Sequence, residues 1–139
     1  MTTEQVENEA LKLKPNYAEA LRGLGNVLIM QGRFPQAQAR FEEMVRLSPA
    51  DAQAHVGLGE ALRRQGELDE ALEQFTYAVR LDPSQPVAHF NLGRILFDRG
   101  KFADAESHFA AVLRQNPADT EARAWLAKTQ AKLRAPPAP

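Results

Sequence analysis

One spaced pattern of residues recurs at a constant interval through most of this chain. Written G-x6-G-x4-A-x3-F-x7-P, the pattern begins at Gly25, Gly59 and Gly93, and we call the interval between successive copies the repeat period. Self-similarity at a fixed period of this length is typical of solenoids, in which one unit covers its apolar face only by stacking on its neighbours. The repeat therefore predicts an array of similar units packed in series.

Each unit contains two segments in which apolar residues fall at helical spacing. In the first unit these stripes contain Ala20, Leu21, Leu24 and Leu28, followed by Phe34, Ala37, Phe41, Met44, Val45 and Leu47. Between the segments stand Gly32, Gly66 and Gly100, at a chain reversal that favours a residue tolerating positive φ. The second segments are followed and stopped by Pro49, Pro83 and Pro117. Each unit is therefore predicted to be an antiparallel pair of helices.

Small and capping residues recur inside and before the predicted helices. The first helices contain Gly25, Gly59 and Gly93, although glycine costs about 1 kcal/mol relative to alanine inside a helix. This recurrence predicts that two helix backbones approach closely there, and the small partners expected opposite the glycines are Ala37, Ala71 and Ala105. Asp51 and Asp119 precede first helices in one register and are candidate N-caps.

In these residues the chain resembles the tetratricopeptide repeat family. Residues 20–49, 54–83 and 88–117 carry the family's small, aromatic and proline positions at the family's spacing. The family's frequent tryptophan near the start of the unit is replaced here by Leu21, His55 and His89. The resemblance implies an all-α fold, an α-solenoid of helix-turn-helix repeats wound into a right-handed superhelix.

The period also predicts how the chain is divided. Three full repeats are expected at residues 18–51, 52–85 and 86–119. Residues 1–17 align with a partial repeat that has only the second helix, and residues 120–134 predict a capping helix made polar by its lysines and arginines. The final segment, residues 135–139, has the sequence APPAP and predicts a disordered tail.

The composition argues against several classes of function. A formal net charge of −1 offers no general attraction to nucleic acid or anionic lipid. The absence of cysteine excludes disulfides, thiolate chemistry and cysteine-ligated zinc. No stretch approaches the roughly 20 apolar residues of a membrane span, and the N-terminal segment lacks the pattern of a secretory signal. We therefore expect a cytoplasmic protein that neither inserts into membranes nor binds nucleic acid.

The sequence predicts no catalytic, cofactor-binding or metal-binding residues. Gly23 and Gly25 lack the third glycine of a dinucleotide fingerprint and fall within a helix. His55 and His89 share one register, but no third ligand falls at a matching position, so packing is predicted for both. Acidic residues of the second helices are expected on a solvated convex face, namely Glu42, Glu43, Asp69, Glu70 and Glu73.

The remaining surface is the face of each first helix that points away from the core of its own repeat. The family resemblance implies that these faces line a concave groove, in which a peptide or helix of another protein binds. At about 100° per residue, the predicted groove residues are Arg22, Asn26, Ile29, Val56, Glu60, Arg63, Phe90, Arg94 and Phe97. Val56, Phe90 and Phe97 are the expected apolar anchors. The arginines are expected to contact acidic groups or backbone carbonyls, although Glu19, Glu60 and Asp98 are candidate partners within their own helices.

Two ligand-binding patterns of the family are incomplete in this chain. The clamp that holds the terminal carboxylate of a peptide fits at Arg22 and Asn26, but its other three places hold Gly57, Val87 and Asn91. The asparagine ladder of the protein-glycosylating transferases needs asparagine at positions 23, 57 and 91, and this chain has it only at position 91. Neither assignment fits.

The sequence therefore predicts a non-enzymatic scaffold for protein–protein interaction. One alternative is an accessory segment of a larger enzyme or of a secretion or assembly machine. Another is a self-assembling module, in which the groove or the partial repeat receives a second copy and forms a homo-oligomer.

Overall fold

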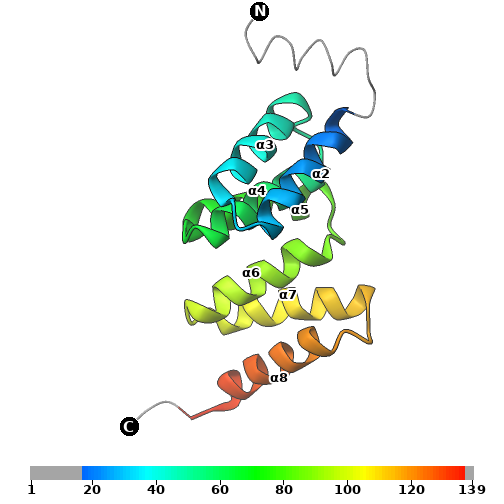
Figure 1. Cartoon of the computed structure of the whole chain (residues 1–139). Coiled ribbons are helices and arrows are strands. Elements are labelled where there is room, and N and C mark those ends of the chain that lie inside the picture. Colours follow the sequence, from blue (N-terminus) through cyan, green and yellow to red (C-terminus); the bar gives the residue numbers. More distant parts are fainter. Residues whose placement is uncertain (1–16, 137–139) are drawn as a thin grey trace, which may run out of the picture. The chain divides into compact units, whose positions relative to one another are not determined.

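The computed structural model describes residues 17–136, and in this range the chain forms seven α-helices and no strand (Figure 1). The helices are α2 (Tyr17–Met30), α3 (Phe34–Leu47), α4 (Ala52–Arg64), α5 (Leu68–Leu81), α6 (Pro86–Asp98), α7 (Phe102–Gln115) and α8 (Thr120–Arg134). The fold is an all-α helical-repeat solenoid, as the resemblance implied. The partial repeat predicted at residues 1–17 and most of the predicted tail lie outside the described residues.

Three tight turns join helices across single glycines. Gly32, Gly66 and Gly100 have φ values of 75°, 81° and 78°, which confirms the predicted use of glycine at these reversals. Among the described residues, none except these glycines has a positive φ. Consecutive helices pack on one another both across these turns and across the proline-containing loops, since α3 packs against both α2 and α4, and α7 packs against both α6 and α8.

The first helices begin at side-chain caps. Asp51 Oδ1 accepts a hydrogen bond from the Gln53 backbone N at 2.9 Å, and Asp119 Oδ1 accepts one from the Ala122 N at 3.0 Å. Both aspartates are therefore N-caps, as predicted. Gln85 fills the same place before α6, where its side-chain oxygen accepts from the Val87 N at 3.2 Å.

The chain divides into two compact units, residues 1–74 and 75–139, with the boundary inside α5. The described part of unit 1 contains α2, α3, α4 and the start of α5, and unit 2 contains the rest of α5 with α6, α7 and α8. Each unit is described by itself below. The right-handed superhelix concerns the whole array and stays a prediction.

The core of unit 1 is built around one phenyl ring. Phe41 of α3 has no exposed surface, and its ring lies against the backbone of Gly25 in α2 and of Gly57 in α4. A Cβ placed on Gly25 would lie 2.6 Å from the Phe41 Cζ. Gly25 is therefore a point of close packing, but the group that approaches its backbone is the Phe41 ring and not a second helix backbone with Ala37 opposite, because the ring projects from α3 into the space that the glycine leaves.

Unit 2 repeats this arrangement with one change. A Cβ on Gly93 would lie 2.6 Å from the ring of Phe109, a fully buried residue of α7. The ring of Trp125 in α8 stacks on Phe109, with centroids 6.0 Å apart and planes 22° apart. Trp125 stands two repeat periods after Gly57. The residue at this repeat position therefore covers the buried phenyl ring in both units, with its backbone in unit 1 and with its indole in unit 2.

Three sequence predictions about burial are wrong. Ala20 and Leu24 were expected in the apolar stripe of α2, but both are exposed, and Leu24 is 47% exposed. Its register equivalents Leu58 and Leu92 are buried, so burial at this register varies with the repeat. Glu43 was expected in solvent, yet only 5% of it is exposed. It is adjacent to the buried Met44, and its Oε2 lies 3.5 Å from the Arg40 Nη1.

Candidate functional site

The charged groove residues of unit 1 pair within their own helices. Arg22 Nη2 lies 3.3 Å from Glu19 Oε1 in α2. In α4, Arg63 donates to both oxygens of Glu60, at 2.7 and 3.1 Å, and Arg64 Nε donates to Glu60 Oε1 at 3.1 Å. Burial favours the neutral form of Glu60, but the hydrogen bonds and charges of Arg63 and then Arg64 outweigh it and hold the pKa of Glu60 below its ordinary value. The intrahelical pairing expected for Arg22 and Arg63 is confirmed, whereas no ion pair joins Arg94 to Asp98 within the described residues.

The apolar groove residues of unit 1 present little surface. Val56 is 8% exposed and Ile29 is half-buried. The polar residue Asn26, which was also predicted for the groove, is exposed. The exposed apolar side chains of α2 lie at Leu24, Val27 and Met30. Unit 1 therefore contributes mainly polar groups at the predicted positions.

The two histidines at the start of α4 and α6 are packing residues, as predicted. His55 Nε2 donates to the Pro49 carbonyl at 2.8 Å, and His89 Nε2 donates to the Pro83 carbonyl at 2.7 Å. Their Nδ1 atoms face the second helix of the repeat, where His55 meets the Gln74 amide at 2.8 Å and His89 meets His108 Nδ1 at 2.9 Å. Each histidine thus ties the preceding loop to a neighbouring helix.

The two histidines of unit 2 face each other through one ring nitrogen each. A carbonyl oxygen only accepts, so His89 Nε2 carries a proton, and one of the two facing Nδ1 atoms donates a hydrogen bond to the other. Burial, and after it the nearby imidazole of His89, lowers the pKa of His108, while Asp104 opposes the shift. Within residues 17–136, no group of three histidine or carboxylate side chains is arranged to hold a metal ion.

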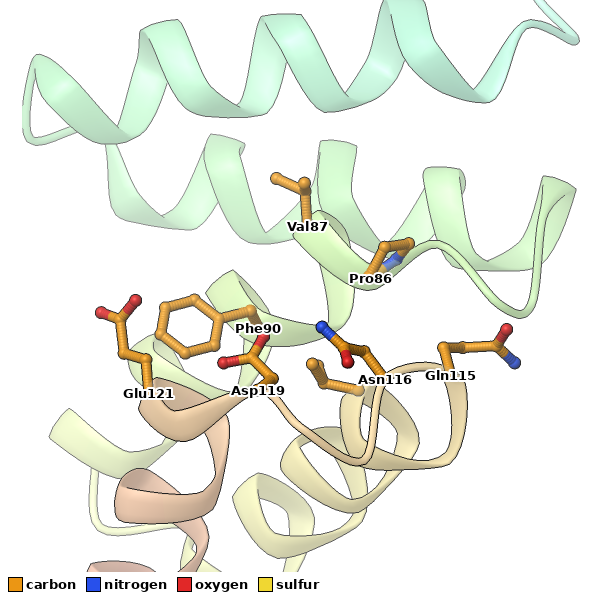
Figure 2. Close-up of a pocket in the computed structure, with 8 residues that line it drawn as sticks. Pro86, Val87, Phe90, Gln115, Asn116, Asp119 and Glu121 are labelled. Atoms are coloured by element: carbon orange, nitrogen blue, oxygen red, sulfur yellow. The ribbon is translucent and has the colours of Figure 1, made fainter.

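Phe90 lies at an apolar cavity of unit 2. The cavity has a volume of about 490 Å³ and is formed by the start of α6, the end of α7 and the start of α8 (Figure 2). Its lining residues are Pro86, Val87, Phe90, Val112, Gln115, Asn116, Asp119 and Glu121. Val87 is 48% exposed, and the Phe90 ring also contacts the Phe109 ring edge-on at 5.9 Å. The walls are therefore apolar, and both charged residues in this lining are acidic.

Phe97 and Arg94 lie farther along α6 and contact α8. The Phe97 ring packs edge-on against Phe102 at 5.2 Å and against Trp125 at 5.3 Å. The Arg94 Cζ lies 4.1 Å from the centre of the Trp125 ring, and the Lys128 Nζ lies 4.5 Å from it. Phe97 is thus largely a packing residue between helices, and two cations flank one indole.

Sequence reasoning placed Phe90, Arg94 and Phe97 on α6 but assigned α8 only a capping role. The residues of α8 that complete this surface are Glu121, Trp125 and Lys128. They stand one repeat period after Val87, Asn91 and Arg94. Residues 120–134 continue the repeat register of the first helices, and applying the groove positions of α6 to this segment would have identified these three residues.

Comparison with models of protein families identifies the family of this chain. One tetratricopeptide repeat model matches residues 23–86, and a second matches residues 62–128 and 96–137. The chain belongs to the tetratricopeptide repeat family. No curated protein matches this tetratricopeptide repeat chain significantly in sequence. None of the helices in the described range is long and apolar enough to cross a membrane.

Solved tetratricopeptide repeat structures are similar over most of the chain. One is the first such domain of Spaghetti (RPAP3) bound to the HSP90 peptide SRMEEVD, with a TM-score of 0.79, 24% identity, and coverage of 85% of this chain and 94% of that one. The first domain of human RPAP3 has a TM-score of 0.78 and 24% identity, covering 86% and 94%. The Yersinia enterocolitica secretion chaperone SycD, in complex with a YopD peptide, has a TM-score of 0.74 and 22% identity, covering 83% and 93%. These likenesses show a shared fold.

Proposed function

We propose that this chain is a non-enzymatic interaction module that binds a peptide or helix of another protein on the predicted groove face of its first helices. The observation that carries the proposal is the cavity beside Val87 and Phe90. Its volume falls in the range of ligand-binding clefts, and its exposed valine stands where a merely solvated helix face would carry a polar residue. The described lining of the cavity contains no nucleophile beside a base, which favours binding over catalysis.

The predicted groove residues differ between the two units, each taken by itself. In unit 2, Phe90 forms a cavity wall, and Arg94 and Phe97 lie on the same helix, so this unit is proposed to supply the apolar anchor sites. In unit 1, Arg22, Asn26, Ile29, Glu60 and Arg63 are proposed to supply polar contacts. Val56 is buried and adds little surface. Peptides bound to the domain of Spaghetti and to SycD, which share this fold, support the proposal.

The test is a selection of binding peptides from a displayed random library against the whole chain, followed by measurement of Kd for three proteins. Val87→Lys places a charge in the cavity without removing a buried group, and we expect it to weaken binding about tenfold or more, about 1.4 kcal/mol. Leu133→Lys is the matched control, because Leu133 is 44% exposed and does not line the cavity. We expect the control to bind like the wild type, and both variants to keep the wild-type melting temperature.

Two results would contradict the proposal. One is a selection that yields no binding peptide. The other is a set of peptides that bind the Val87→Lys variant as tightly as the wild type, since the binding surface would then lie elsewhere on the chain.

A further inference from the structure

The cavity of unit 2 has a negative electrostatic character. Among the described residues that line it, only Asp119 and Glu121 are charged. Asp119 uses Oδ1 to cap α8, and Glu121 is exposed and its side chain makes no ion pair or hydrogen bond with a described residue. The N-termini of α6 and α8 each bring about half a positive charge, and the C-terminus of α7 brings about half a negative one. The sum with two carboxylates is clearly negative, so the cavity favours a cation beside an apolar group.

A second charged site lies farther along the same two helices. Arg94 and Lys128 both lie within 4.5 Å of the centre of the Trp125 ring. Neither has an ion-pair partner within residues 17–136, and the Arg94 Nε is buried without a hydrogen-bond partner there. A cation–π contact leaves the positive charge in place. These two side chains therefore attract an anionic group.

The two charged sites are separated by a fixed distance along the helices. Val87 and Arg94 are two helical turns apart in α6, and Glu121 and Lys128 are two turns apart in α8. Two turns of an α-helix span about 10 Å along its axis. An extended peptide covers that distance in about three residues. The face formed by these four residues thus has an acidic, apolar end and a basic, aromatic end.

We propose that this face of unit 2 binds a partner segment in which an apolar residue and a neighbouring basic residue occupy the cavity, and an acidic residue about three positions away lies at Arg94 and Lys128. The proposal rests on the proposed function and adds the chemistry of the partner. It commits to a peptide carrying both charges in one order, because the charges of the face are opposite at its two ends.

The test compares two peptides of identical composition, each of which contains one leucine. Each peptide is synthesised once with its sequence written forwards and once with the sequence reversed, so that both binding directions are sampled. In the matched peptide, arginine is next to the leucine and glutamate is in the third position beyond the arginine; in the swapped peptide the two charges are exchanged. Kd is measured by fluorescence anisotropy at low salt. Each exposed charge contact changes affinity by a factor of about two to five, so we expect the matched peptide to bind about tenfold more tightly. The preference should shrink at high salt.

Charge-reversed variants of the protein complete the experiment. The double variant Glu121→Lys/Lys128→Glu keeps the net charge and should abolish the preference, because each end of the face then carries one positive and one negative side chain. Arg134→Glu, with the same charge change as Lys128→Glu but at the last residue of α8, should leave the preference unchanged. Melting curves of all variants are recorded as a check that each one is folded.

The outcomes separate the two proposals. If both peptides bind the wild type equally, or if the double variant keeps the wild-type preference, the charge arrangement is refuted while peptide binding stands. If neither peptide binds although library peptides do, this inference is refuted and the proposed function stands. If neither kind of peptide binds, both are refuted.

Discussion

Two glycines of α2 should respond in opposite ways to the same substitution. A Cβ on Gly25 would lie 2.6 and 2.7 Å from two ring atoms of Phe41, whereas unstrained carbon contacts lie at about 3.5–4.0 Å. The ring therefore has to move by about 1 Å, and it is held, because Phe41 is fully buried and Gly57 packs against the same ring. Gly23, on an exposed part of the same helix, has no atom within 4 Å of the added methyl.

The magnitudes follow from these two environments. Replacing glycine by alanine inside a helix stabilises it by about 0.5–1 kcal/mol, and Gly23→Ala should show this full gain. Gly25→Ala has the same gain, but overpacking costs about 1–3 kcal/mol. The net effect of Gly25→Ala should therefore be a destabilisation of about 0.5–2 kcal/mol, which separates the two variants by about 1–3 kcal/mol.

The assay is urea denaturation followed by circular dichroism, with the free energy of unfolding compared at constant m-value. A third variant, Phe41→Leu, removes the ring, and in that background Gly25→Ala should be less destabilising, which a double-mutant cycle measures. Equal stabilisation by Gly23→Ala and Gly25→Ala would refute the reasoning, because it would mean that the ring adjusts to the methyl group without cost.

Two further predictions concern unit 2. Burial lowers the pKa of His108 in the folded protein. The contribution of this group to the free energy of unfolding is therefore fully present above the unfolded pKa of about 6.5 and is lost as the pH falls toward the folded pKa, so the melting temperature should decrease over that range. His108→Gln, which copies Gln74 of the other unit, should reduce this pH dependence in thermal melts at a series of pH values; an unchanged slope would contradict it. Phe97→Ala should destabilise by about 2 kcal/mol, since the half-buried ring packs on Phe102 and Trp125. Emission of the single tryptophan, Trp125, should shift to the red as the ring is uncovered, and unaltered stability would place Phe97 outside the core.

The helices and their turns could be predicted from the sequence because their signals are local. A glycine with positive φ at Gly32, a capping carboxylate at Asp51 and a proline after each second helix act within a short stretch around their own position. The constant repeat period then reproduces these local signals along the chain. Packing of His55 and His89 was also predictable, since a lone histidine without further ligands at matching positions satisfies its nitrogens within the fold.

Burial and the composition of the site depended on tertiary structure, because a shared register does not give a residue the same neighbours. Leu24 is exposed where Leu58 and Leu92 are buried, and Glu43 is buried although it is charged. The residue that covers the core phenylalanine is Gly57 in one unit and Trp125 in the other.

The cavity shows the same distinction most clearly. Its walls come from the start of α6, the end of α7 and the start of α8, so its acidic rim is formed by residues that are distant in sequence from Val87. The sequence alone determined that Phe90 lies on a first helix, away from its helix's own apolar stripe. Only the packing of α8 on α7 placed Asp119 and Glu121 beside that ring, because contact between residues distant in sequence is a property of the folded chain.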